Sequence, residues 1–151
     1  MSGNLKGAFL MAITVTAKNV RMLAGAIGRD FEAAGTINVG DAVYLDTSGK
    51  MLQARANAAA TSFAVGVLVA SYDGDTSIGA GERGTVCTFG PVGGYAGLIE
   101  GSPTYLSDTA AGGLVDTQPS GTGKWSHVIG YGERDGVLFV LPGVKAPQSL
   151  T

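Results

Sequence analysis

The side chains that most often act as catalytic bases and nucleophiles are scarce in this sequence. His127 is the only histidine and Cys87 is the only cysteine. A triad that includes Ser126 is disfavoured, because neighbouring residues on a strand point to opposite faces. Cys87 lies in an apolar run without a nearby base to activate its thiol, which favours a position in the core. We therefore expect no catalytic residues and a protein that is not an enzyme.

Metal and cofactor sites are also poorly supported. One histidine and one cysteine cannot build a multi-histidine or cysteine-based zinc site within one chain. Asp73 and Asp75 flank a glycine but lack the ligand spacing of an EF-hand, so we interpret them as turn residues that bind their own backbone. The single cysteine also rules out an intrachain disulfide, which fits folding in a reducing compartment. We expect no metal and no cofactor.

Two glycine-rich segments have the spacing of nucleotide-binding loops without the required context. The spacing of a dinucleotide-binding turn occurs at residues 79–84, GAGERG. A polar loop precedes this segment and an expected strand follows it, whereas the motif needs a strand before it and a helix after it. Residues 121–125, GTGKW, place Trp125 where a phosphate-binding loop needs serine or threonine. We reject both segments as nucleotide sites.

The composition limits the fold class. Glycine accounts for 25 of the 151 residues, about one in six, against a usual share of roughly 7%. Charged residues make up 15% of the chain, where roughly 25% is typical. Hydrophobic residues reach 45%, which argues against disorder, and glycine costs about 1 kcal/mol relative to alanine inside a helix. These features predict an all-β protein with some surface covered by a partner.

The charge distribution excludes two kinds of partner. The 10 basic and 12 acidic residues give a formal net charge of −2, and the basic residues are scattered singly. Nucleic-acid binding needs a clustered basic face, so we expect no nucleic-acid partner. No run approaches the roughly 18 to 20 apolar residues of a membrane span, so we expect a soluble protein. The apolar stretch near the N-terminus is short for a secretion signal, and the alternation at residues 13–18 fits a strand better.

Turn residues divide the first part of the chain into short elements. We expect a hairpin, one helical turn, a buried strand, a polar connection and another strand, at residues 42–55, 57–61, 63–70, 72–84 and 85–89. Gly90 and Pro91 are expected to end the last of these strands.

The second part of the chain repeats the first weakly. Residues 40–46 (GDAVYLD) align with residues 101–107 (GSPTYLS), and a glycine turn follows each. An apolar run around a glycine comes next in both segments, at Gly66 and at Gly130. Closing strands before Gly/Pro turns then follow at residues 85–91 and 136–142. The repeated unit is a hairpin, a glycine-containing strand and a closing strand.

This repeat defines the expected domain, residues 36–143. Its two related halves, about 36–91 and 97–143, predict a small β-barrel or β-sandwich of about eight to ten strands. Tyr44 and Tyr105 hold equivalent positions beside leucine and are expected to be half-buried strand residues.

The ends of the chain differ from this domain. Residues 1–35 form either an arm that packs along another subunit or adds a strand to a sheet edge, or an ordinary first strand with a loop. Residues 144–151 form a C-terminal tail that we expect to be loosely held.

The order and spacing of these motifs resemble tailed-bacteriophage head decoration (capsid cement) proteins. The resemblance is carried by the segments at residues 40–50, 64–67, 105–107, 127–130 and 140–142, and it covers roughly residues 36–143. It implies a small β-barrel or β-sandwich with an extended N-terminal arm, commonly a homotrimer. It also implies a virion protein that is made in the host cytoplasm and binds the major capsid protein on the outer capsid surface, without catalysis.

The candidate contact residues follow from this hypothesis. Those expected to touch the capsid or a neighbouring subunit are Lys6, Phe9, Leu10, Met11, Arg21 and Arg29. The alternative is a β-rich receptor- or glycan-binding module of a phage tail or fibre. In that case Tyr72, Tyr95 and Trp125 would lie in loops and stack on sugars.

Overall fold

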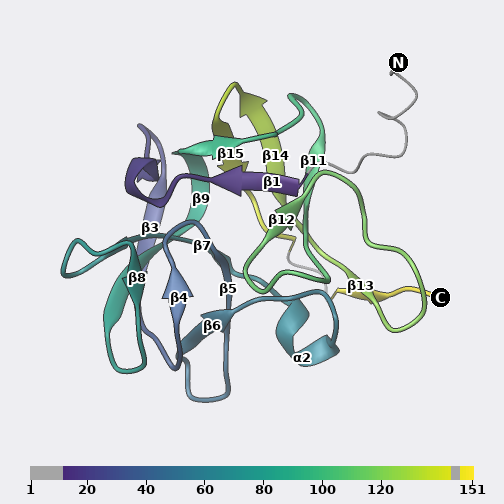
Figure 1. The fold of residues 1–151 in the computed structure, drawn as a ribbon, viewed down its shortest axis with the longest axis horizontal. Coiled ribbons are helices and arrows are strands. Elements are labelled where there is room, and N and C mark those ends of the chain that lie inside the picture. Colours follow the sequence, from purple (N-terminus) through teal and green to yellow (C-terminus); the bar gives the residue numbers. More distant parts are fainter. Residues whose placement is uncertain (1–11, 144–146) are drawn as a thin grey trace.

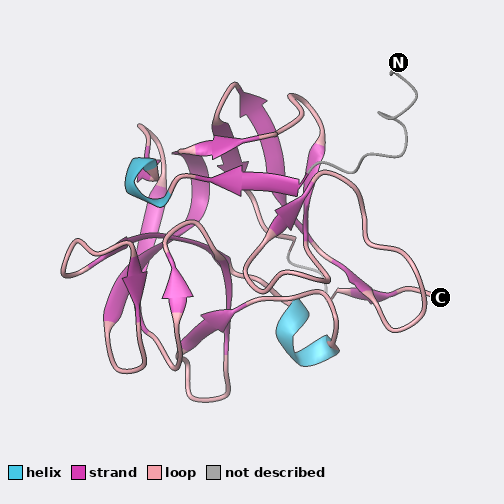
Figure 2. Cartoon of the chain, viewed as in Figure 1, coloured by secondary structure: helices cyan, strands magenta, loops and turns pink. Residues whose placement is uncertain are grey.

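The computed structural model describes residues 12–143 and 147–151, and the chain is nearly all β, with 47% strand and 5% helix. A curled antiparallel sheet forms a half-barrel (Figure 1), which confirms the predicted all-β barrel or sandwich class. Figure 2 shows the two short helices, η1 (Ala17–Asn19) and α2 (Ala59–Ser62), among strands and long loops. No helix of the described residues is long and apolar enough to span a membrane.

The strands are short and follow one another closely along the chain. They are β1 (Ala12–Val15), β2 (Arg21–Met22), β3 (Ile27–Glu32), β4 (Ile37–Asn38), β5 (Ala42–Leu45), β6 (Met51–Gln53), β7 (Gly66–Ser71), β8 (Ser77–Ile78), β9 (Arg83–Gly93), β10 (Tyr95–Ala96), β11 (Pro103–Leu106), β12 (Leu114–Val115), β13 (Trp125–Ser126), β14 (Val128–Arg134), β15 (Val137–Val140) and β16 (Gln148–Ser149).

One large sheet contains most of these strands, in the order β10-β1-β12-β11-β14-β15-β9-β7-β5-β6, with β2 and β3 also paired to β9. Two small sheets, β13-β16 and β4-β8, complete the fold. In Figure 1, β9 runs between the strands of the upper part, β11 to β15, and those of the lower part, β3 to β8. The first part of β9 pairs with β3 and β7, and its last residues pair with β2 and β15.

The prediction that Gly90 and Pro91 end a strand is wrong, since β9 continues to Gly93. Gly90 has a φ of 112°, and a Cβ there would lie 2.5 Å from the Cα of Ala26. Only glycine accepts both conditions, so β9 changes direction here without losing its partners. Pro91 lies opposite Phe139, and its carbonyl oxygen accepts a hydrogen bond from the Leu23 amide at 2.9 Å. The missing amide hydrogen of Pro91 therefore leaves the strand paired on both sides.

The two repeated segments have the same strand order and the same register. The hairpin β5-β6 corresponds to β11-β12, and each hairpin is followed in the sheet by a glycine-containing strand, β7 or β14, and a closing strand, β9 or β15. The matching cross-strand partners are Ala42↔Val67 with Pro103↔Tyr131, Val43↔Gly66 with Thr104↔Gly130, Tyr44↔Leu52 with Tyr105↔Val115, and Leu45↔Met51 with Leu106↔Leu114. Tyr44 and Tyr105 are both half-buried, as predicted.

Other local expectations agree closely with the structure. The hairpin expected at residues 42–55 is β5-β6, and the helical turn expected at 57–61 is α2. The buried strand expected at 63–70 begins later, because β7 starts at Gly66.

The N-terminal region is more regular than either of its two expected forms. Residues 12–35 contain β1, η1, β2 and β3, and all three strands pair within the large sheet. Any arm is thus confined to residues before Ala12, which lie outside the described residues. At the other end, Gln148 and Ser149 pair with β13, so this part of the tail is not loosely held.

One hydrophobic core joins both halves of the sheet. Its largest fully buried side chains come from strands of each half, Met51, Leu68 and Val86 from the first and Leu106, Ile129 and Leu138 from the second. Burial of this surface is worth roughly 1.5–3 kcal/mol for each such side chain.

Candidate interaction surface

His127 is a structural residue in the segment between β13 and β14. Its side chain is buried, its Nε2 lies 3.1 Å from the carbonyl oxygen of Ala64, and the Phe63 ring packs edge-on at 5.4 Å. Because a carbonyl can only accept, Nε2 donates the hydrogen bond. Burial lowers the pKa of His127, against the opposing effect of the Ala64 bond, and so favours the neutral imidazole.

Cys87 lies in the core, as the sequence predicts. The thiol is free and buried, and its Sγ is 3.4 Å from the carbonyl oxygen of Phe89. Burial raises the pKa of the Cys87 thiol, which disfavours the reactive thiolate.

The carboxylates are separated into local roles. Asp46 accepts hydrogen bonds from the Ser48 and Lys50 amides, so it closes the turn between β5 and β6. Asp41 binds the Asn38 amide at 2.8 Å and the Gln53 side chain at 2.7 Å. Within residues 12–143 and 147–151, no group of three or more His, Cys, Asp or Glu side chains is placed to hold a metal ion.

The two glycine-rich segments are connections between strands. Residues 79–84 turn from β8 into β9, and the Glu82 carboxylate binds the Gly79 amide. Residues 121–125 turn into β13, with a hydrogen bond from the Lys124 amide to the Gly121 carbonyl. Neither segment leads into a helix, so neither has a helix N-terminus to hold a phosphate.

A row of large apolar side chains crosses four strands of the main sheet. We call this the apolar row: Ile27 of β3, Phe89 of β9, Phe139 of β15 and Tyr131 of β14. Ile27 pairs with Phe89 and Phe139 pairs with Tyr131 across their strands, so each pair shares a face. The Phe89 and Phe139 rings meet edge to face at 5.2 Å, and the Tyr131 and Phe139 rings stack at 5.1 Å. The four side chains therefore form one continuous contact series.

The apolar row lies at the surface. Ile27 is 55% exposed, Phe89 is 42% exposed and Tyr131 is 36% exposed, while Phe139 is half-buried between the other rings. Sequence reasoning missed this row, because its members belong to strands that are distant along the chain and each residue alone resembles a core residue.

Acidic side chains lie beside the Tyr131 end of the row. We call Glu100, Glu133 and Asp135 the acidic rim. Glu133 and Asp135 follow Tyr131 in β14 and the turn after it, and Glu100 forms a β-bridge with Gly132. All three are exposed. Arg134 pairs with Glu133 at 3.4 Å, so the rim retains a net negative charge.

The predicted contact residues fall into two groups. Arg21 of β2 and Arg29 of β3 are exposed on strands that pair with β9. The Arg21 guanidinium donates to the Asn19 carbonyl at 3.0 Å. Lys6, Phe9, Leu10 and Met11 lie outside the described residues.

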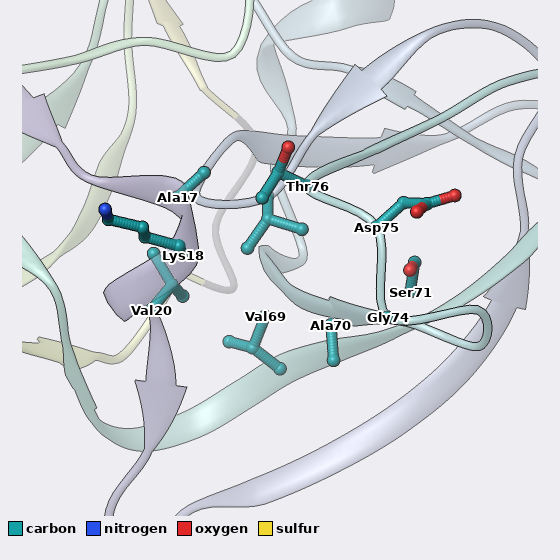
Figure 3. A pocket seen from close by; sticks show the side chains of 10 residues that line it. Ala17, Lys18, Val20, Val69, Ala70, Ser71, Gly74, Asp75 and Thr76 are labelled. Atoms are coloured by element: carbon teal, nitrogen blue, oxygen red, sulfur yellow. The ribbon is translucent and has the colours of Figure 1, made fainter.

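A hollow of about 250 Å³ lies between η1, β7 and the connection that follows β7. Val20, Val39 and Val69 form its apolar wall. Figure 3 shows Lys18 and Asp75 on opposite sides of the hollow, with their charged ends directed away from the valines. This arrangement can accept an apolar group, but it lacks polar groups that converge on one ligand.

The aromatic side chains proposed as sugar platforms are not equivalent. Tyr95 is buried in β10, and its hydroxyl donates to the Gly40 carbonyl at 2.9 Å, so the prediction that it stacks on a ligand is wrong. Trp125 is half-buried in β13. Tyr72 is 58% exposed; its hydroxyl donates to Asp30 at 2.7 Å, and the Arg83 guanidinium lies 6.0 Å from its ring centre. Of the three, Tyr72 presents its ring most openly.

No protein-family model matches this chain, and no curated protein matches it.

Proposed function

We propose that this chain is a non-catalytic structural protein that binds the outer surface of an assembled phage capsid and stabilises it as a homotrimer. The apolar row carries the proposal, because it exposes three large apolar side chains and a stacked phenylalanine on rigid strands. Contiguous exposed apolar side chains mark interaction sites, and aromatic residues are enriched at the centres of interfaces. The resemblance of residues 36–143 to head decoration proteins supplies the kind of partner.

The fold suits such a role energetically. The row is held by strand pairing and ring contacts, so binding orders few additional side chains. A protein that binds the assembled lattice more tightly than free subunits stabilises the lattice by mass action. A trimer that engages several lattice positions gains further affinity, because the later contacts form within one complex.

The direct test compares assembled shells with free subunits. The purified chain is added to empty shells and to unassembled major capsid protein of the same phage, and binding is measured by co-sedimentation. We expect binding to shells, together with a higher shell melting temperature, and little binding to free subunits. Equal binding to both forms, or no binding to shells, would contradict the proposal.

Row variants connect this binding to the surface described above. Phe89→Ser should weaken shell binding about 10-fold, the loss expected for an aromatic residue at an interface centre. Tyr72→Ser is the matched control, since it removes another exposed aromatic ring outside the row. An equal loss in both variants would argue against the row as the contact.

The receptor- or glycan-binding alternative depends mainly on Tyr72. Electron microscopy of labelled particles distinguishes the two functions, because a decoration protein labels the head regularly. Label restricted to the tail would favour the alternative.

A further inference from the structure

The apolar row and the N-terminal segment have complementary chemistry. Residues 9–11 are Phe, Leu and Met, and residues 1–11 contain Lys6 but no acidic residue. The apolar row offers an exposed apolar surface, and the acidic rim beside it carries three carboxylates and one guanidinium. The segment thus matches the surface both in apolar character and in charge.

The length of the segment permits this contact between copies. Eleven extended residues span at most about 36–40 Å. The segment joins the sheet at Ala12, where β1 pairs with β12, and β11 and β14 follow in the sheet. At about 4.8 Å between strands, β14 lies only about 14 Å from β1. The segment is therefore longer than its own sheet requires and can extend to a neighbouring molecule.

We propose that residues 1–11 of one copy cover the apolar row of a second copy, with Phe9, Leu10 and Met11 on the row and Lys6 toward the acidic rim. This inference rests on the proposed homotrimer and names the contact that holds it together. In a cyclic trimer each copy donates one segment and accepts one, so the contacts close into a ring and leave no row uncovered.

Crosslinking in the full-length chain identifies the contact. A photo-crosslinking phenylalanine analogue replaces Phe9, and ¹⁴N- and ¹⁵N-labelled copies are mixed before irradiation. We expect crosslinks of mixed isotope composition from position 9 to β9, β14 or β15. Crosslinks only within one copy, or crosslinks to other parts of the sheet, would overturn the proposal.

Self-association of full-length variants supplies the second readout. Sedimentation should show that Phe9→Ser with Met11→Ser weakens association at least about 10-fold, and that Phe89→Ser does the same. Tyr72→Ser is the control and should associate like the wild type. Circular dichroism verifies that each variant keeps its β structure. Unchanged association of folded Phe89→Ser would overturn the proposal.

Charge reversal tests the acidic rim. Lys6→Glu should weaken association, and adding Glu133→Lys to the same chain should restore part of it. Loss of association without recovery would count against the placement of Lys6.

Shell binding of the same variants separates this inference from the proposed function. If copies exchange their segments but the trimer ignores shells, the decoration function fails and the inference stands. If shells bind a chain whose position 9 crosslinks elsewhere, the inference fails and the decoration function stands.

Discussion

Gly66 of β7 and Gly130 of β14 occupy the same position in the two halves of the sheet. At each site a Cβ would overlap a carbonyl oxygen of the closing strand, that of Cys87 in β9 for Gly66 and that of Phe139 in β15 for Gly130. The absence of a side chain lets the two backbones approach closely. The alignment of these glycines in the sequence thus corresponds to one packing requirement that occurs twice.

Gly66→Ala and Gly130→Ala should each destabilise the fold by about 2–3 kcal/mol, the upper part of the range for overpacking, because the opposing atoms are backbone. Urea unfolding of the two variants measures the change. Gly79→Ala is the control, since a Cβ there would meet only the Glu82 carboxylate at 3.5 Å. A loss below about 0.5 kcal/mol at Gly66 would show that β7 moves to accept the methyl group.

Tyr95→Phe should destabilise the fold by about 1–2 kcal/mol, because it leaves the buried Gly40 carbonyl without its hydrogen bond. Thermal unfolding measures this loss. Tyr105→Phe is a matched control: Tyr105 is half-buried, and its hydroxyl makes no hydrogen bond to the residues that the structure describes. Equal effects of the two changes would assign no special role to the Tyr95 bond.

Asp41→Asn should change how stability depends on pH. Burial raises the pKa of Asp41, against the hydrogen bonds from Gln53 and Asn38 that lower it. The folded state therefore holds this proton more tightly than the unfolded chain, whose Asp titrates near about 3.9. Stability from this group is present below that value and is lost as the pH rises through the folded pKa.

Urea unfolding of wild type and Asp41→Asn between pH 3.5 and about 7 measures the effect. The free energy of unfolding of the wild type should fall relative to that of the variant as the pH rises. A constant difference across the series would mean that Asp41 has the same pKa in both states.

His127→Gln should remove a pH dependence of the opposite sign. Burial lowers the pKa of His127, so the folded state binds this proton less tightly than the unfolded chain, in which histidine titrates near about 6.5. Wild-type stability should fall as the pH drops below that value and through the folded pKa. NMR titration of the His127 ring measures the folded pKa directly, and a value at or above 6.5 would refute this account.

Short-range features were largely predictable from the sequence. The hairpin β5-β6 follows from alternating apolar residues around a turn closed by Asp46, and both signals lie within a dozen residues. The end of β9 was wrongly predicted, because Gly90 and Pro91 usually end strands. Here Gly90 instead fits against Ala26, a contact that no local pattern contains. The burial of Tyr95 was missed for the same reason, since its partner Gly40 lies 55 residues away.

The sequence by itself determined the all-β class, the buried position of Cys87 and the repeated hairpin units, because these depend on composition and on residues close together in the chain. Only the tertiary structure decided which apolar side chains stay at the surface. Ile27, Phe89 and Tyr131 have the residue types of a core, and each becomes exposed because strand pairing turns it to a face that the rest of the described chain leaves uncovered. Their meeting with Phe139 depends on the register between β9 and β15, and register is set by the whole sheet.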